Sequence, residues 1–280
     1  MKSGAPCPSL SRVQLSQVSK LIRFAAVAAV LLSPSGGHAQ GANGSRAAFG
    51  VGESLVYDVK YGFLNVGSGR MEVVGIDTVR GREAWHFRLA IRAGVPGFRV
   101  HDVLESWVDV ETFSALRYRQ TLTQGGKQEK DSIEIFPDRG VFHEVEWRQA
   151  KDGSGWTQKN KPEAPTVSAP LDEASFLFFA RTQPLEDGQT YSFARYYKPD
   201  KNPVQVTVVR REKVNVPAGS FNTIVLRPVF KTKGIFSQNG RAEMWLTDDD
   251  RRMMVRMETH VAFGSITLLL KEFQSGLIEP

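Results

Sequence analysis

The chain has 280 residues, with 36 lysines and arginines against 30 aspartates and glutamates, a formal net charge of +6, and one cysteine, Cys7. Four of the excess positive charges lie in residues 1–39, which contain no acidic residue, so residues 40–280 carry a net charge of only +2. So small a charge argues against nucleic acid as a partner. Because residues 40–280 contain no cysteine, they hold no disulfide, thiol nucleophile or cysteine-ligated metal.

The N-terminal segment has the features of an export leader. Lys20 and Arg23 precede nine apolar residues, 24–32, and small residues near the end of the segment mark a cleavage position. A bilayer span needs about twenty apolar residues, so this run is too short. We predict a signal peptide at 1–39, a flexible linker at 40–50 and no transmembrane span after cleavage. A short N-terminal anchor or a buried helix is the alternative.

From residue 53 onward, apolar and polar residues alternate. For example, Trp85, Phe87 and Leu89 fall on one face of a strand, and His86 falls on the other. This alternation is typical of antiparallel strands with one buried and one solvated face. Glycine-containing turns between the runs predict a meander. The strands predicted for the first half include 53–61, 100–110, 115–123, 128–136 and 141–147.

The regular pattern stops at 149–170, where three prolines and two glycines predict a surface loop. Asp172 then provides a helix N-cap, and apolar residues at helical spacing predict a short helix over 173–181. Four consecutive apolar side chains, 176–179, favour a helix that fills the core over an exposed recognition helix.

The second half repeats the β pattern of the first. A Glu-x-Trp motif ends at Trp107 and again at Trp245, 138 residues later, and strand-like runs open at Gly52 and Gly188, 136 residues apart. A repeat of this length predicts a duplicated β unit whose halves pack together. The strands predicted for the second half cover 190–197, 203–213, 220–230, 241–247, 252–261 and 265–273.

These patterns predict a mainly β fold. Two pseudo-repeated antiparallel meanders form one curved sheet or open barrel, with one short helix at the junction. The half-repeats cover 51–148 and 188–274, a loop-helix segment at 149–187 joins them, and together they make a single β-rich domain over 51–280.

Two loops that contain glycine, residues 94–98 and 233–237, lie just before the two Glu-x-Trp strands. Each loop carries an aliphatic residue and a phenylalanine. Because loop tips are normally polar, such tips predict a groove lining or a lipid contact. Folding back over the open ends of the sheet is the alternative. Together with the two tryptophans, these residues form the predicted ligand-binding set: Val95, Phe98, Ile235, Phe236, Trp107 and Trp245.

Patterns that indicate catalysis are weak. Glu105 and Glu243 each lie two residues before a tryptophan, and an acid pair is what glycoside hydrolases use. The favoured interpretation is structural pairing with Arg117, Arg119 or Arg256 on neighbouring strands. No histidine pair has metal-ligand spacing, and no Gly-x-Ser-x-Gly motif occurs. We predict no cofactor, no metal and no catalytic residue.

Several segments resemble the DUF3108 family of exported bacterial proteins. They are residues 216–221 (VPAGSF), 242–252 (AEMWLTDDDRR) and 263–267 (FGSIT), and residues 52–62 resemble the opening of the family. The resemblance implies an exported, β-rich domain and carries no assigned biochemical function or catalytic residues. A long curved antiparallel sheet is also similar to the lipoprotein carriers and lipid-binding proteins of the Gram-negative envelope.

Taken with the leader, this resemblance predicts a non-catalytic protein that is periplasmic or associated with the outer envelope of a bacterium. We expect it to bind a lipid or a lipid-modified protein in the concavity of the curved sheet. An assembly or structural factor that acts through protein–protein contact is the alternative, and a carboxylate-dependent hydrolase ranks third. The sequence leaves the oligomeric state open.

Overall fold

The computed structural model describes residues 48–229, 231, 242–261 and 264–277. The predicted signal peptide and residues 40–47 of the predicted linker lie outside these ranges. The described elements are β1 (Ser54–Tyr61), β2 (Leu64–Val79), β3 (Arg82–Val95), β4 (Phe98–Asp109), β5 (Ala115–Gln124), β6 (Lys127–Phe136), η1 (Pro137–Arg139), β7 (Val141–Gln149), β8 (Trp156–Asn160), β9 (Ala164–Pro165), α2 (Glu173–Arg181), β10 (Thr190–Phe193), η2 (Pro199–Lys201), β11 (Val204–Val216), β12 (Gly219–Val229), β13 (Glu243–Thr247), β14 (Met254–Val261) and β15 (Gly264–Gln274).

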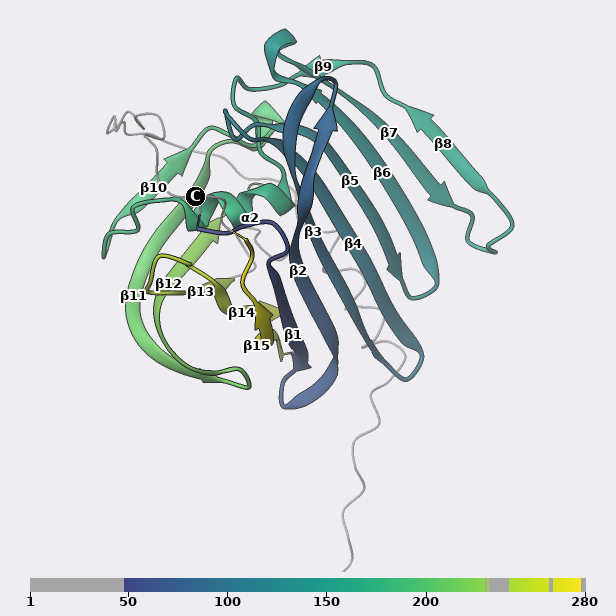
Figure 1. Ribbon diagram of the computed structural model, residues 1–280. Helices are drawn as coiled ribbons and strands as arrows, with labels where there is room; N and C mark the ends of the chain where they lie inside the picture. The colour runs from purple at the N-terminus through teal and green to yellow at the C-terminus, as the bar shows by residue number, and fades with distance from the viewer. Residues whose placement is uncertain (1–47, 230, 232–241, 262–263, 278–280) are drawn as a thin grey trace, which may run out of the picture.

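The strands form one antiparallel sheet that curves around the helix (Figure 1). Its order is β10-β11-β12-β13-β14-β15-β1-β2-β3-β4-β5-β6-β7-β8, with β9 paired to β7. Strand β1 pairs with β2 on one side and with β15 on the other, so it joins the two meanders. In the described part of the chain, the end strands β10 and β8 do not pair with each other. The prediction of a mainly β fold with a curved, open sheet and one short helix is confirmed.

Helix α2 begins and ends where the sequence predicts. The Asp172 side chain accepts hydrogen bonds from the backbone N–H groups of Ala174 and Ser175, and Ser175 Oγ accepts from the Asp172 N–H, which completes a capping box. Phe178 stacks on Phe87 of β3 with a centroid separation of 3.8 Å. We call the sheet face that packs against α2 the inner face and the opposite one the outer face. No helix in the described ranges is long and apolar enough to cross a membrane.

The C-terminal end of α2 is tied down by a buried arginine. The Arg181 side chain is 0% exposed and forms an ion pair with Glu53, at 2.6 and 2.9 Å. The same guanidinium donates to the backbone oxygens of Ala48 and Arg251, each at 2.8 Å. The helix therefore binds both the segment before β1 and the turn between β13 and β14. Removing one partner of a buried ion pair costs about 3–5 kcal/mol.

Residues 48–50 do not behave as the predicted linker. Phe49 is 2% exposed and packs edge-on against Trp85, Phe87 and Phe178, at centroid distances of 5.3–5.6 Å. Its burial among aromatic rings outweighs the small, polar composition of its neighbours, on which the linker prediction rests.

The prediction of a loop without strands at 149–170 is also wrong. Strand β8 pairs with β7 over five residues, and the short β9 pairs with the beginning of β7. Every residue of β8 is exposed. A strand at the edge of a sheet that buries neither face shows no apolar alternation, so the sequence carries no signal for it.

Candidate binding surface

The inner face becomes more exposed toward the turns that join β1 to β2 and β3 to β4. On β3, Phe87 and Leu89 are buried near the helix, whereas Ile91, Ala93 and Val95 are half-buried. These five residues alternate along one strand and therefore share a face. One end of the inner face of β3 is therefore covered by the helix, and the other end is a partly exposed apolar surface.

Neighbouring strands continue this surface. Leu104 of β4 lies opposite Leu89, and Val100 lies opposite Ala93. Residues opposite each other in an antiparallel sheet share a face. We call the half-buried residues together the inner apolar patch: Tyr61, Ile91, Ala93, Val95, Phe98, Val100, Leu104, Leu122 and Ile266.

Strand β2 crosses the patch without side chains. Gly67 and Gly69 occupy successive inner positions, opposite Ala93 and Ile91. A Cβ on Gly67 would lie 2.0 Å from the backbone oxygen of Arg92, so β2 and β3 approach too closely for any other residue. Neither glycine contributes a side chain to the patch, and the Leu268 side chain lies 3.5 Å from the place of a Cβ on Gly69. The predicted ligand-binding set does not include these glycines, although the Gly-Ser-Gly run at 67–69 is their signal in the sequence.

A carboxyl group lies among the residues of the patch, on the same face. Asp102 is opposite Ile91, and it accepts hydrogen bonds from the backbone N–H of Thr123 at 3.1 Å and from Nε2 of Gln124 at 2.7 Å. Burial raises the pKa of Asp102 above its ordinary value of 3.8, although both hydrogen bonds act in the opposite direction. The patch therefore has a polar group beside its apolar side chains.

The turns beside the patch differ in what they expose. Phe63, between β1 and β2, is 89% exposed, and Leu64, the first residue of β2, is 49% exposed. Phe98 instead packs on the β5–β6 turn, where a Cβ on Gly125 would lie 2.7 Å from its ring. The position of Phe98 thus agrees with the alternative interpretation, in which an apolar loop residue folds back over the end of the sheet. Phe63, which is not in the predicted ligand-binding set, is the exposed aromatic residue of the neighbouring turn.

The structure brings together part of the predicted ligand-binding set. Val95 and Phe98 face each other across the β3–β4 turn, on the inner face. Ile235 and Phe236 lie outside the described residues. Val95 and Phe98 belong to the inner apolar patch, and their role in ligand binding remains a proposal.

Trp107 and Trp245 point away from the inner face. Ser106 donates a hydrogen bond to Asp172 at the helix cap, at 2.6 Å, so its neighbour Trp107 lies on the outer face. The registers of β1, β15, β14 and β13 place Met244 on the inner face and its neighbour Trp245 on the outer one. Neither tryptophan lines the concavity of the sheet.

Both tryptophans occupy the same kind of polar surroundings. Nε1 of Trp107 donates to Asp77 at 2.7 Å, and Nε1 of Trp245 donates to Glu212 at 2.6 Å. In each case the carboxylate comes from the strand two positions away in the sheet, β2 or β11. Two guanidinium groups lie 4.5–5.7 Å from each indole ring. The arrangement holds each ring under cations on the outer face.

Glu105 and Glu243 do not form a catalytic pair. They lie on β4 and β13, with five strands between them in the sheet, whereas glycosidase carboxyls are about 5–10 Å apart. Glu105 lies 3.4 Å from Nε2 of His86. Glu243 pairs with Arg210 and Arg227, at 3.0 and 2.6 Å.

The structural partners predicted for these glutamates are therefore wrong. Arg117 pairs with Glu134, and Arg256 pairs with Glu258. Arg119 lies over the Trp107 ring and, within the described ranges, forms no ion pair. Cross-strand neighbours in the sequence pattern compete for the same carboxylates, and the register decides which pair forms.

These features define an open, single-sheet β protein with a helix on its concave side and a partly open apolar surface beyond that helix. The chain belongs to the DUF3108 family, described as a protein of unknown function, whose match covers residues 56–271. The family resemblance seen in the sequence is confirmed. No curated protein matches the chain.

The chain is also similar to solved structures of low sequence identity. A β-barrel-like protein of the DUF1849 domain of unknown function from Brucella abortus is 10% identical, with a TM-score of 0.45, over 81% of this chain and 98% of that one. A candidate lipoprotein from Parabacteroides distasonis is 12% identical, with a TM-score of 0.30, over 83% and 100%. A candidate exported protein with a YmcC-like fold from Bacteroides fragilis is 13% identical, with a TM-score of 0.27, over 81% and 98%. These likenesses assign no function to the chain.

Proposed function

We propose that the protein is an exported, non-catalytic protein of the bacterial envelope that binds an apolar or amphipathic ligand, either a lipid or a lipid-modified protein, on the inner apolar patch. The observation that carries this proposal is the set of half-buried apolar side chains on the helix side of the curved sheet. Contiguous exposed apolar surface marks contact with protein, lipid or ligand. The exposed tip at Phe63 extends that surface beyond the sheet.

The composition of the patch favours an acyl chain. Its half-buried side chains from β1, β3, β4, β5 and β15 are mostly aliphatic or aromatic, and an acyl chain is apolar and needs no hydrogen bonds. Asp102 offers a polar contact for the head of an amphipathic ligand. Pockets for small ligands combine the same two elements, an apolar lining and a few polar groups.

The test uses the full chain purified from the bacterial envelope. Native mass spectrometry with organic extraction detects a co-purifying acyl chain, and a fluorescent fatty acid measures uptake. The variant Ile91→Asn places an amide on the patch, and Val103→Asn is its control, because Val103 is also half-buried and lies opposite Ala90 on the outer face. We expect Ile91→Asn to weaken probe binding about tenfold, since the buried amide loses its water, and Val103→Asn to leave it unchanged.

Two results would overturn the proposal. One is a protein that purifies without any acyl chain and takes up no probe on titration. The other is an equal loss of affinity in Ile91→Asn and Val103→Asn, because a site on the inner face does not respond to a change on the outer one.

An assembly factor that works by protein–protein contact is the second candidate. Every residue of β8 is exposed, and Trp156 is 42% exposed. Within the described ranges, the edge of β8 that faces away from β7 is unpaired. Unpaired strand edges accept strands from partners. A clean mass without ligand, together with crosslinks that map to β8, would favour this function.

A further inference from the structure

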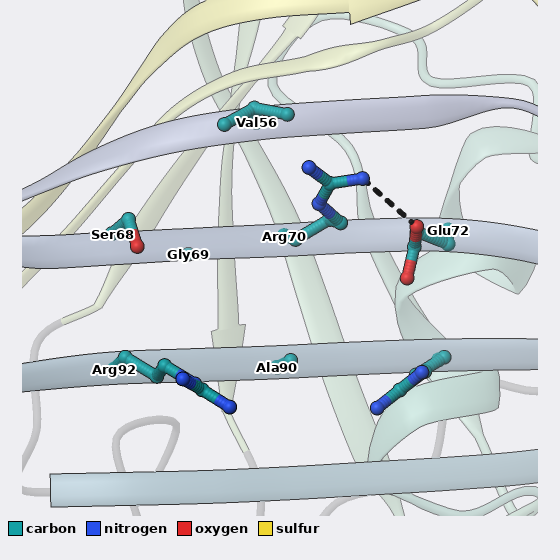
Figure 2. A pocket seen from close by; sticks show the side chains of 8 residues that line it. Val56, Ser68, Gly69, Arg70, Glu72, Ala90 and Arg92 are labelled. Atoms are coloured by element: carbon teal, nitrogen blue, oxygen red, sulfur yellow. Dashed lines mark hydrogen bonds and ion pairs between the residues drawn. The ribbon is translucent and has the colours of Figure 1, made fainter.

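A groove of about 350 Å³ lies on the outer face of β1, β2 and β3 (Figure 2). Val56 and Ala90 point into the groove with short side chains, so its middle is low. The other lining residues include four charged side chains and one serine. The groove and the inner apolar patch thus lie on opposite faces of the same strands.

Arginines dominate the charged lining. Arg70 and Glu72 form an ion pair at 3.3 Å, drawn in Figure 2. Nε of Arg92 donates to Nε2 of His101 at 3.2 Å. Arg88 is the third arginine of the lining, so one glutamate faces three guanidinium groups and leaves an excess of two positive charges.

Arg88 is left without a carboxylate. It lies opposite Glu72 on β2 and Glu105 on β4. Glu72, however, pairs with Arg70, and Glu105 lies 3.4 Å from Nε2 of His86. Within the described ranges, no acidic side chain forms an ion pair with Arg88, which is exposed to solvent.

We propose that this groove binds a phosphate ester, with Arg88 and Arg92 as the binding residues and Arg70 at the rim. A planar guanidinium donates two parallel hydrogen bonds to phosphate oxygens, and the excess of two positive charges attracts both a dianionic phosphate monoester and a monoanionic phosphodiester. The ester can be the headgroup of a phospholipid or a soluble organic phosphate. This inference goes beyond the proposed function and does not depend on it, because the two surfaces lie on opposite faces.

The test measures binding of the full chain at low ionic strength, where exposed charges are least screened. Glycerol 3-phosphate is titrated by calorimetry, and vesicles of phosphatidylglycerol are compared with vesicles of phosphatidylcholine by co-sedimentation. The double variant R88Q/R92Q removes two guanidinium groups from the groove. The double variant R139Q/R227Q is the matched control, since it removes two partly exposed arginines outside the groove. Thermal unfolding checks that both variants fold.

We expect R88Q/R92Q to weaken binding at least about tenfold and the control to change it less than about twofold. Binding of glycerol 3-phosphate assigns a soluble phosphate, whereas binding to phosphatidylglycerol vesicles alone assigns a headgroup. No binding by the unaltered protein in either assay overturns the inference. An equal loss in the control variant also does, because it reduces the effect to overall charge.

Discussion

Strands β4 and β13 each hold a tryptophan on the outer face, under two guanidinium groups and against a carboxylate from the strand two positions away. On the inner face the same strands differ. Ser106 of β4 donates to the helix cap, whereas its counterpart in β13, Met244, is 1% exposed in the core. The outer-face arrangement is thus common to the two halves, and the inner face distinguishes them.

The tryptophans themselves differ in their apolar neighbours. Trp245 is 3% exposed and belongs to the main core, whereas Trp107 is 7% exposed and packs in a small separate cluster with Val79, Ala84 and Leu116. The same motif therefore places Trp245 in the main core and Trp107 in a small local cluster. Making the same substitution at both tryptophans tests how much the two positions differ in their contribution to stability.

The largest expected effect comes from truncating each tryptophan. Replacing a buried tryptophan by alanine costs about 3–5 kcal/mol in free energy of unfolding. We expect Trp245→Ala near the upper end of this range and Trp107→Ala near the lower end, because fewer buried apolar residues surround Trp107. Urea unfolding of both variants measures the difference. Equal losses would show that the small cluster and the main core behave as one unit.

A smaller effect distinguishes the inner faces. Burial raises the pKa of Asp172 from 3.8 to about 7, although its hydrogen bond from Ser106 opposes the shift. Because the folded state prefers the protonated form, the contribution of Asp172 to stability is fully present below about pH 4 and is lost as the pH rises to about 7. Among the described residues, no side chain of β13 makes such a bond to the helix cap.

The variant Asp172→Asn keeps an N-cap acceptor but removes the charge. Between pH 4 and pH 8 we expect its unfolding free energy to fall less than that of the unaltered protein, by at least about 1.4 kcal/mol, the equivalent of one pKa unit. Asp172→Ala, which loses about 1 kcal/mol of capping, is the control. Parallel pH profiles for Asp172→Asn and the unaltered protein would contradict the assignment.

The smallest effect concerns the carboxylates that accept from the indoles. A hydrogen bond from Arg210, followed by that from Trp245, holds the pKa of Glu212 below its ordinary value of 4.5. Its stabilising contribution is therefore present above that value and is lost as the pH falls through the lower, folded-state pKa. Because Glu212 is partly exposed, we expect Glu212→Gln to cost less than about 1 kcal/mol at pH 7. The cost should shrink in acid, as measured by thermal unfolding at both pH values, and a constant cost would be evidence against the ionic contribution.

Local signals made much of this fold predictable. Asp172 and the apolar spacing after it define a helix whose observed ends match the predicted ones. Alternation and turn residues likewise locate long strands such as β5 and β6 to within one residue at each end. These features depend on neighbours in the sequence, so the sequence contains them.

The candidate site was less predictable because it depends on register. Trp107 and Trp245 are apolar enough for a core, yet their glutamate neighbours at i−2 share their face, and that face is the outer one. The need for glycine at position 67 becomes visible only once the backbone of β3 is known to lie against β2. Such pairings are set by the whole sheet and are not readable from either strand alone.

The seam between β1 and β15 constrains the order of folding. Ser54 pairs with Gln274, so the seam joins residues separated by almost the whole described chain, and Arg181 fastens the segment before it. Pairings of such long range are slow to form, because the chain between them must first close into a loop. A chain that emerges N-terminus first can form the hairpins of β2–β7 as it appears, but β1 keeps an unpaired edge until β15 is available. Any fragment that ends before β15 therefore exposes a strand edge that invites pairing with other chains.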